Sequence, residues 1–395
     1  MRSEWEIKKL CEIVEFNPRE SLSKGIIAKK ISMDKLQPFC RDIPSYEFEA
    51  FSGGTKFRNG DTIMARITPC LENGKTAKVS ILDDNEIGFG STEYIVFRAK
   101  EGMDEDFLYY LVCSSIIREP AIKSMVGSSG RQRVQIDVLQ NLEIQVPSVK
   151  EQRIIGKILR NLDDKIQLNN KINKNLEQQA QAIFIEQFAD NIFNSTTNNF
   201  PSLGDLVKII DNRGKTPPLT TKTFKYPIID VGALKGRNRI VDFNNCTKYV
   251  DDTTYNTWFR SGHPKPWDIL LSTVGSLAEM KVYLGTKGCI AQNVIAIRSI
   301  SVSPLYLYQY LKFIRNDLVA YNIGSVQPSI KVTHIIKHPI FLPAKKKLDN
   351  FDKIARIITK QIFTNYSENE LLISMRDTLL KKLMSGEIDI SNIDF

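Results

Sequence analysis

Two stretches of this sequence carry the same heptad-spaced positions in the same order, 196 residues apart. The first stretch has Ile155, Leu159, Leu162, Ile166, Asn169, Asn173, Leu176, Ala180, Ile183 and Gln187, and the second has Phe351, Ala355, Ile358, Ile362, Asn365, Asn369, Leu372, Arg376, Leu379 and Leu383. Alternating steps of four and three keep these positions on one side of a helix, facing a partner helix. Each stretch therefore predicts a long helix that packs against another helix.

The repeat continues upstream of both predicted helices. The segment 93–98 aligns with 293–298, and 108–111 with 308–311. The offset drifts elsewhere, as expected when loops of different length carry specificity on a shared scaffold. A chance similarity between two unrelated α/β domains is the alternative, and the preserved order of the matches argues against it. The chain is therefore expected to contain two large, similar domains.

These patterns predict an α/β (α+β) fold with an internal repeat, and 395 residues suffice for two cores of ordinary size. The predicted parts are a first domain at 1–147, a long helix at 148–190, a polar linker at 191–199, a second domain at 200–347, and a second long helix with a tail at 348–395. Shorter helices are expected at 104–117 and 304–321. A short apolar strand, 142–146 or 339–342, is expected before each long helix.

The net charge of +9 is concentrated in the second domain. Residues 200–347 contain 21 Lys and Arg against 9 Asp and Glu, whereas residues 1–147 contain 20 against 22. A domain this basic favours a polyanionic partner, and nucleic acid is the commonest polyanion in the cytosol. A basic surface without a specific partner is the alternative.

Other classes of protein are disfavoured by what the sequence lacks. No apolar run approaches the length of a membrane span and the first residues have no signal-peptide core, so a cytoplasmic protein without membrane contact is expected. The six cysteines have no CxxC spacing and the three histidines form no ligand pattern. Neither a disulfide framework nor a metal site is predicted.

Four segments rich in glycine and hydroxyl side chains are the candidates for nucleic-acid contacts: 127–133, 324–331, 211–218 and 272–276. Small residues let backbone amides approach phosphate, and the forked side chains of Arg and Gln match guanine and adenine edges. Each segment alone is an ordinary surface turn in the alternative interpretation. The candidate residues are Arg66, Lys75, Ser128, Ser129, Arg131, Gln132, Arg133, Arg213, Lys215, Thr216, Thr273, Ser276, Ser325, Gln327 and Lys331.

A self-contained active site is not predicted. The sequence has no Gly-x-Gly-x-x-Gly or P-loop pattern and no Asn/Asp-Pro-Pro-aromatic tetrad of the amino-methyltransferase kind. Acidic residues such as Asp61, Glu72 and Glu93 form no nuclease-like cluster with a trailing lysine. Three rival functions remain: a site-specific nuclease, an RNA-binding adaptor that prefers single strands, and a scaffold whose helices only assemble proteins.

The chain resembles the specificity subunits of type I restriction-modification systems. The resemblance depends on the two variable modules, each followed by a long helix, on the Pro-x-x-x-Glu-Gln-x-x-Ile junction at 147–155, and on the leucine-rich tail 379–388, which contains Ser-Gly-Glu. The Gly-Lys-Thr-Pro turn at 214–217 is similar to a loop of the family's recognition domains. The second junction, at 344–349, lacks Glu-Gln, and the first domain lacks a Gly-x-Thr-Pro turn.

The resemblance implies a non-catalytic subunit with two target-recognition domains, each specific for one half of a bipartite double-stranded DNA site. It also implies an antiparallel pair of long helices with pseudo-twofold symmetry, which sets the nonspecific spacer between the half-sites. The implied partners are two modification (methyltransferase) subunits and restriction subunits. S-adenosylmethionine, ATP and Mg²⁺ are expected on these partners and no cofactor on this chain.

The matched heptads predict the register of the helix pair. If the helices are antiparallel and centred, Asn169 approaches Asn369 and Asn173 approaches Asn365, and the four amides form a polar layer that fixes register. Apolar side chains left outside this seam, among them Ile172, Phe184 and Phe363, are the candidate docking points for a partner subunit, with packing against the parent domain as the alternative.

Overall fold

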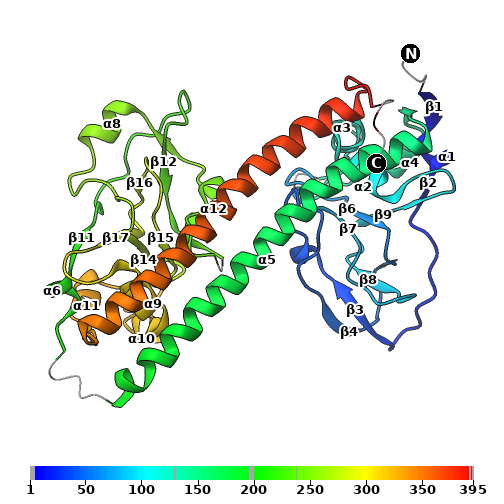
Figure 1. Cartoon of the computed structure of the whole chain (residues 1–395). Coiled ribbons are helices and arrows are strands. Elements are labelled where there is room, and N and C mark those ends of the chain that lie inside the picture. The colour runs from blue at the N-terminus through cyan, green and yellow to red at the C-terminus, as the bar shows by residue number, and fades with distance from the viewer. Residues whose placement is uncertain (1–4, 129, 195–199, 237, 391–392, 394–395) are drawn as a thin grey trace. The chain divides into compact units, whose positions relative to one another are not determined.

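The computed structural model describes residues 5–128, 130–194, 200–236, 238–390 and 393, and the chain divides into two compact units (Figure 1). Unit 1 comprises Met1–Leu168 and Asn369–Phe395, and unit 2 comprises Asn169–Glu368. The long helices α5 (Val149–Asn194) and α12 (Lys345–Met384) each pass from one unit into the other. Each unit therefore holds one globular domain and one part of each long helix.

The domain of unit 1 contains two four-stranded sheets and a two-stranded ribbon. Their strand orders are β2-β9-β6-β7, β4-β3-β8-β5 and β1-β10. The elements are β1 (Glu6–Lys9), α1 (Leu10–Ile13), β2 (Val14–Phe16), β3 (Ile27–Ile31), η1 (Met33–Lys35), β4 (Glu47–Ala50), β5 (Thr55–Phe57), β6 (Thr62–Ala65), β7 (Thr76–Lys78), β8 (Gly88–Gly90), β9 (Tyr94–Ala99), α2 (Glu105–Cys113), α3 (Ser115–Lys123), α4 (Ile136–Gln140) and β10 (Glu143–Val146).

The domain of unit 2 contains a four-stranded sheet, β11-β17-β14-β15, and a three-stranded sheet, β13-β12-β16. The elements are α6 (Leu203–Leu206), β11 (Val207–Ile210), β12 (Tyr226–Ile229), α7 (Val231–Leu234), η3 (Phe243–Asn245), β13 (Tyr249–Val250), α8 (Asp252–Thr257), β14 (Ile269–Ser272), β15 (Met280–Val282), β16 (Cys289–Ile290), β17 (Val294–Ser299), α9 (Pro304–Phe313), α10 (Arg315–Ala320) and α11 (Val332–Ile336).

The internal repeat is visible in the sheets. In unit 1, β6 pairs antiparallel with both β9 and β7, and in unit 2, β14 pairs antiparallel with both β17 and β15. A parallel pair recurs as well, β3 with β8 and β12 with β16. Every residue of β6 and β14 is buried because these strands lie inside their sheets, which explains why three of the four residues in each strand are apolar.

The shorter helices are interrupted where single helices were predicted. The carboxylate of Asp104 caps α2 by accepting hydrogen bonds from the amides of Asp106 and Phe107. The segment then breaks at Ser114, whose extended backbone ends α2 and begins α3. In unit 2 the break falls at Ile314, between α9 and α10. The apolar pattern continues across both breaks, so periodicity alone could not reveal them.

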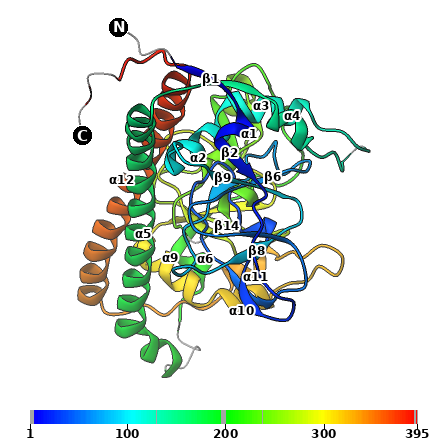
Figure 2. The ribbon, with the colours of Figure 1, turned by 90° about the vertical axis from the view of Figure 1, so that its right-hand side faces the viewer.

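In unit 1 the two long helices lie side by side and pack around a buried ion pair (Figures 1 and 2). Ile155 and Leu159 of α5 and Leu383 of α12 are buried in one apolar cluster with the domain. Asp163 and Arg376 are both buried, and a guanidinium nitrogen lies 2.8 Å from a carboxylate oxygen. Gly386, with φ +67°, follows the end of α12 in the left-handed conformation of a helix cap.

In unit 2 the helix pair contains buried amide side chains. The Nδ2 of Asn365 donates to the Oδ1 of Asn173 at 2.8 Å, which is the pair that the heptad register predicts. Asn169 donates to the carboxylate of Glu368, the residue before its predicted partner Asn369. Since residue numbers rise along one helix as they fall along the other, the two segments are antiparallel.

The phenylalanines near the end of α5 are buried in the core of unit 2. Phe184 is completely buried and its ring contacts the rings of Phe188, Tyr306 and Phe351. The prediction that Phe184 is a docking point for a partner is therefore wrong, because burying such a ring in its own domain stabilises the fold by about 1.5–3 kcal/mol. Ile172 and Phe363 remain partly exposed, at 37% and 36%.

Two predicted boundaries differ from the structure. Helix α5 continues to Asn194, into the predicted linker 191–199, because Ile192 packs against the core and the ring of Phe193 contacts that of Phe313. Residues 195–199 lie outside the described part of the chain. The strand predicted at 339–342 is reduced to a single bridge between Ser202 and Pro339, since proline cannot donate the next ladder hydrogen bond.

Within the described ranges, no helix is both long enough and apolar enough to cross a membrane.

The buried Asn173–Asn365 pair generates a prediction about stability. Asn173→Leu alone is expected to lower the free energy of unfolding by about 1–3 kcal/mol, because the buried amide of Asn365 then lacks its partner. Asn173→Leu combined with Asn365→Leu removes both amides and is expected to restore or exceed wild-type stability. Thermal and denaturant unfolding of the chain measures both effects, and a double variant less stable than the single one would contradict the prediction.

Candidate nucleic-acid interface

The glycine-serine segment of unit 1 forms a tight hairpin. Val126 and Arg133 exchange backbone hydrogen bonds of 3.0 and 2.9 Å across its base. Gly127 has a φ of +136°, and a Cβ at this position would lie 2.9 Å from the carbonyl oxygen of Arg131. Glycine is therefore required here by the close approach of the backbone. Ser129, a candidate contact residue, lies outside the described residues.

The hairpin of unit 1 is joined to the loop that follows β6. Ile67 forms a bridge with Arg133, and the amide of Thr68 donates to the carbonyl of Gln132 at 3.1 Å. On the other side, the amide of Val134 donates to the carbonyl of Arg66 at 2.9 Å. Two loops that lie about 60 residues apart in sequence therefore form one surface at the end of the sheet.

Arg66 and Lys75 are held within this domain. The guanidinium of Arg66 is partly buried and within 3.5 Å of the carbonyl of Val134. The ammonium of Lys75 donates to the carbonyl of Met33 at 2.8 Å. Each side chain therefore has one structural partner, and its other N–H groups could still contact DNA without breaking that bond.

The arginines at the hairpin differ in availability. Arg131 is exposed, and its side chain has no hydrogen-bond or ion-pair partner among the described residues. Arg133 forms a bidentate ion pair with Glu93, with a closest N–O distance of 2.6 Å. The hydrogen bond from Arg133 lowers the pKa of the Glu93 carboxyl below its ordinary value. Ser128 is exposed and Gln132 is half-buried, so the accessible candidates are Ser128, Arg131 and part of Gln132.

Unit 2 repeats this construction. A hairpin closes between Asn322 and Ile330, and the oxygen of the Asn322 side chain accepts hydrogen bonds from the amides of Gly324 and Ser329. A Cβ on Gly324 would collide with the carbonyl of Gln327. Val274, in the loop after β14, forms a bridge with Ser329. The loop after β14 and the hairpin are thus joined as their counterparts are in unit 1.

The candidate residues of this second hairpin are accessible. Ser325, Gln327 and Lys331 are exposed, and no described residue is recorded as a partner of their side chains. Lys331 stands at the N-cap of α11 without a side-chain capping hydrogen bond. A cation and an amide are therefore available on this hairpin, as an arginine and an amide are on the first.

Thr273 corrects a sequence prediction. Its side chain is completely buried, and its hydroxyl has no hydrogen-bond partner among the described residues. Thr273 directly follows β14, and its backbone is hydrogen-bonded to Asn293 and Ile330. These bonds hold the backbone in a position in which the Thr273 side chain is buried. Ser276 is half-buried, and its carbonyl accepts a hydrogen bond from the hydroxyl of Ser272. Thr273 is therefore a structural residue in this conformation.

The third candidate loop, 211–218, borders a cleft of about 420 Å³ in unit 2. Arg213 forms a bidentate ion pair with Asp211 at 2.6 Å, whereas Lys215 is exposed. The hydroxyl of Thr216 accepts a hydrogen bond from Gln292 at 3.2 Å, which joins the loop to the segment before β17. The lining residues are Arg213, Thr216, Pro217, Leu219, Ile228, Asp230, Lys248, Val274, Ala291, Gln292 and Asn293.

Sequence analysis did not identify Gln292 or Lys248 as members of this cleft. Gln292 precedes Asn293, whose counterpart in the repeat is Glu93 beside Arg133. The repeat alignment could thus have indicated Gln292. Glu93 contacts a candidate loop in unit 1, and the aligned segment of unit 2, which contains Gln292, also contacts a candidate loop. Lys248 lies in an irregular segment that no pattern distinguishes from other exposed lysines.

The profile of the family described as "Type I restriction modification DNA specificity domain" matches residues 2–178 and again 196–373. The chain belongs to this family. The two matches cover most of the sequence and coincide with the two copies of the repeat, so the DNA specificity domain occurs twice.

Relatives along most of the chain are type I specificity subunits. The MjaIX specificity subunit of Methanocaldococcus jannaschii is 23% identical over 312 residues, which cover 74% of this chain and 71% of the relative. The HindI specificity subunit of Haemophilus influenzae is 24% identical over 411 residues, covering 84% and 87%. The crystal structure of the S subunit from M. genitalium has a TM-score of 0.55 at 16% identity over 96% of both chains, and so shares the fold.

The Glu93–Arg133 ion pair generates a prediction about DNA affinity. Glu93→Gln is expected to release the guanidinium of Arg133, so that one more cation can contact phosphate. Nonspecific DNA affinity at low salt should rise, and the slope of log affinity against log salt should steepen by about 0.9. The measurement is a salt titration of DNA binding by the full-length chain.

The matched control is Glu86→Gln, which removes a carboxylate 2.9 Å from Lys29, a lysine that is almost completely buried. This variant should leave the salt dependence unchanged.

Acid has the same effect as the Glu93 substitution: because the folded-state pKa of Glu93 is depressed, the ion pair is intact above the unfolded pKa and is lost as pH falls through the folded value. An unchanged slope for Glu93→Gln would show that Arg133 has a structural role only.

Proposed function

We propose that this chain is the non-catalytic subunit that recognises a bipartite double-stranded DNA site, with one half-site bound by each recognition domain. The observation that carries the proposal is the duplicated pairing of a strand-end loop with a glycine-containing hairpin. Each hairpin exposes hydroxyl, amide and cationic side chains: Ser128 and Arg131 in unit 1, and Ser325, Gln327 and Lys331 in unit 2.

The chemistry of these side chains suits the grooves of DNA. An arginine such as Arg131 can bind guanine O6 and N7 with two hydrogen bonds, and a glutamine such as Gln327 can bind adenine N6 and N7. Lys331 suits a phosphate, because an ammonium is a point charge without the planar fork that reads a base. Cleft-lining residues of unit 2, with Lys215 and Lys248 exposed, extend the cationic surface beside the hairpin.

The long helices support a fixed spacing between the half-sites. Helix α5 has 46 residues and α12 has 40, and each is continuous between the two units. At 1.5 Å per residue, α5 is roughly 69 Å long. We infer that a helix pair continuous between the two domains limits the DNA spacer to one length.

The proposal assigns catalysis to partner subunits. Two methyltransferase subunits with S-adenosylmethionine and restriction subunits with ATP and Mg²⁺ are the expected partners, because relatives are named specificity subunits of type I restriction enzymes. Among the described residues, no three His, Cys, Asp or Glu side chains gather as metal ligands. The exposed faces of α5 and α12 are the proposed docking surface, with Ile172 and Phe363 as its anchors.

Methylation profiling of DNA tests the recognition of two half-sites. The wild-type chain, assembled with its methyltransferases, is expected to direct methylation to one bipartite motif. Arg131→Ala should relax one base position in one half-site, with a loss of about 1–3 kcal/mol against the preferred base. Lys331→Ala should weaken methylation of all sites by a similar factor without changing the motif. A motif with a single contiguous half, or no DNA motif at all, would contradict the proposed function.

Association with the methyltransferase tests the docking surface. Ile172→Glu and Phe363→Glu are expected to weaken the complex at least tenfold, because a buried carboxylate without a partner costs more than about 1.4 kcal/mol. Ile300→Glu, at an apolar residue 70% exposed and away from both helices, is the matched control. Native mass spectrometry should give two methyltransferases per chain, and a stable assembly with one would overturn the proposed stoichiometry.

A further inference from the structure

Among the contacts that attach the domain of unit 2 to the helix pair are a small apolar cluster, Ile240 with Ala180, Ile358 and Ile362, and two others. One of these two is the aromatic cluster in which Phe184 and Phe188 of α5 pack against Tyr306 of the domain and Phe351 of α12. The other is polar and lies seven residues earlier on α5, at Glu177. Two turns of helix separate the aromatic and the polar attachment, a distance of roughly 10 Å.

The polar attachment is centred on Arg239, the largest completely buried side chain among the described residues. Its Nε donates to Glu177 Oε1 at 2.7 Å and its Nη2 to Glu177 Oε2 at 3.0 Å, so the pairing is bidentate. Its Nη1 donates to the hydroxyl of Thr359 on α12 at 2.7 Å. One guanidinium from the domain therefore binds both long helices at once.

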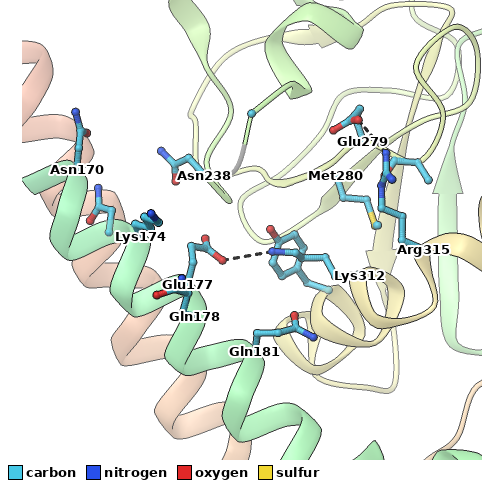
Figure 3. Close-up of a pocket in the computed structure, with 14 residues that line it drawn as sticks. Asn170, Lys174, Glu177, Gln178, Gln181, Asn238, Glu279, Met280, Lys312 and Arg315 are labelled. Atoms are coloured by element: carbon cyan, nitrogen blue, oxygen red, sulfur yellow. Dashed lines mark hydrogen bonds and ion pairs between the residues drawn. The ribbon is translucent and has the colours of Figure 1, made fainter. Parts of the chain in front are cut away.

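A cavity of about 610 Å³ lies beside this attachment, between α5 and the body of the domain (Figure 3). Lys174, Glu177 and Gln181 line it from the helix, and Met280 and Lys312 line it from the domain. Lys312 lies 3.5 Å from the carboxylate of Glu177 across this space. Because side chains do not fill the gap, close packing is absent on the cavity side of the helix, and polar contacts hold the domain there.

Unit 1 has a counterpart of Arg239 at the repeat offset of 198. Arg41 is buried, and its guanidinium lies 2.7 Å from the carboxylate of Asp164 and 3.4 Å from the carbonyl of Arg160, both on α5. Tyr110 of α2, beside Arg41, donates to Asp163 of α5 at 2.6 Å, and the ring of Tyr308 of α9 lies beside the Arg239 guanidinium. In both units a buried arginine with a neighbouring tyrosine thus contacts a long helix.

We propose that Arg239 and Arg41 are positioning residues that fix the tilt of each recognition domain on the helix pair and thereby the spacer length that the protein accepts. The proposal rests on the proposed function, because a spacer exists only for a bipartite site. A bidentate, fully desolvated guanidinium holds one orientation, since its planar fork matches one placement of the carboxylate. Without Arg239, the aromatic cluster and the apolar cluster around Ile240 remain, and because apolar packing is less directional than a bidentate ion pair, the domain is expected to tilt more freely.

The test is methylation profiling of the double variant Arg239→Met with Glu177→Gln, assembled with its methyltransferases. Both charges of the bidentate pair are neutralised together, and Lys312, which loses its carboxylate partner, is partly exposed and can be hydrated. The half-site sequences should stay as in the wild type, because the hairpins are untouched. Methylation at sites whose spacer is one base pair shorter or longer should rise about tenfold relative to the cognate spacer.

The matched control is Arg315→Met with Glu279→Gln. This ion pair, at 3.0 Å, also lies at the cavity, but both its residues belong to the domain and neither is on a long helix (Figure 3). The control is expected to keep the single spacer. If the test variant is poorly folded, Arg239→Lys, which keeps the charge but loses the bidentate geometry, should give a smaller rise in the same direction.

Four outcomes decide the inference. Relaxed spacing in the Arg239 variant alone supports it. A folded Arg239 variant with one unchanged spacer, or equal relaxation in the control, overturns it, and so does a change in the half-site bases. Failure of the proposed function itself is distinguishable, because the wild-type complex would then show no bipartite motif.

Discussion

The antiparallel packing of α5 against α12 is the interaction on which both units depend. Neither unit contains a complete long helix, so each domain is completed by segments from distant parts of the sequence. The register is fixed twice: by Asp163 with Arg376 in unit 1 and by Asn173 with Asn365 in unit 2. A slip by one helical turn would separate both pairs and leave several buried polar groups unpaired, at about 1–3 kcal/mol for each neutral group and more for each charge.

The loops for DNA recognition follow from the sheets that carry them. The buried strands β6 and β14 are inner strands of their sheets. The loop that follows each strand forms a β-bridge with a hairpin about 60 residues later in the sequence. Backbone hydrogen bonds hold this junction, so the side chains at the hairpin can vary without loss of the scaffold. This separation of scaffold from side-chain identity is what a family of proteins with different DNA sequences requires.

The sequence predicted the features that depend on periodicity and repetition. The heptads located both long helices, and an antiparallel, centred arrangement of the two stripes gave the partners Asn173 and Asn365. Periodicity could not predict which apolar side chains the parent domain covers, and Phe184 was wrongly assigned to a partner surface for this reason.

The candidate contacts were harder to predict than the helices. Composition identified the hairpins, but Thr273 is buried and Arg133 is paired with Glu93, 40 residues away in sequence. Arg239 carried no signal at all, because its partners on α5 and α12 lie 62 and 120 residues away. Ion pairs between distant segments depend on the folded arrangement, and a single sequence does not encode them in any local pattern.

A hydroxyl-radical footprint of the assembled complex on its cognate DNA tests whether two equivalent units recognise two separate half-sites. Two protected segments, divided by an accessible spacer of constant length, are expected. A single continuous protected segment, or protection of one half-site only, would contradict the recognition of two half-sites.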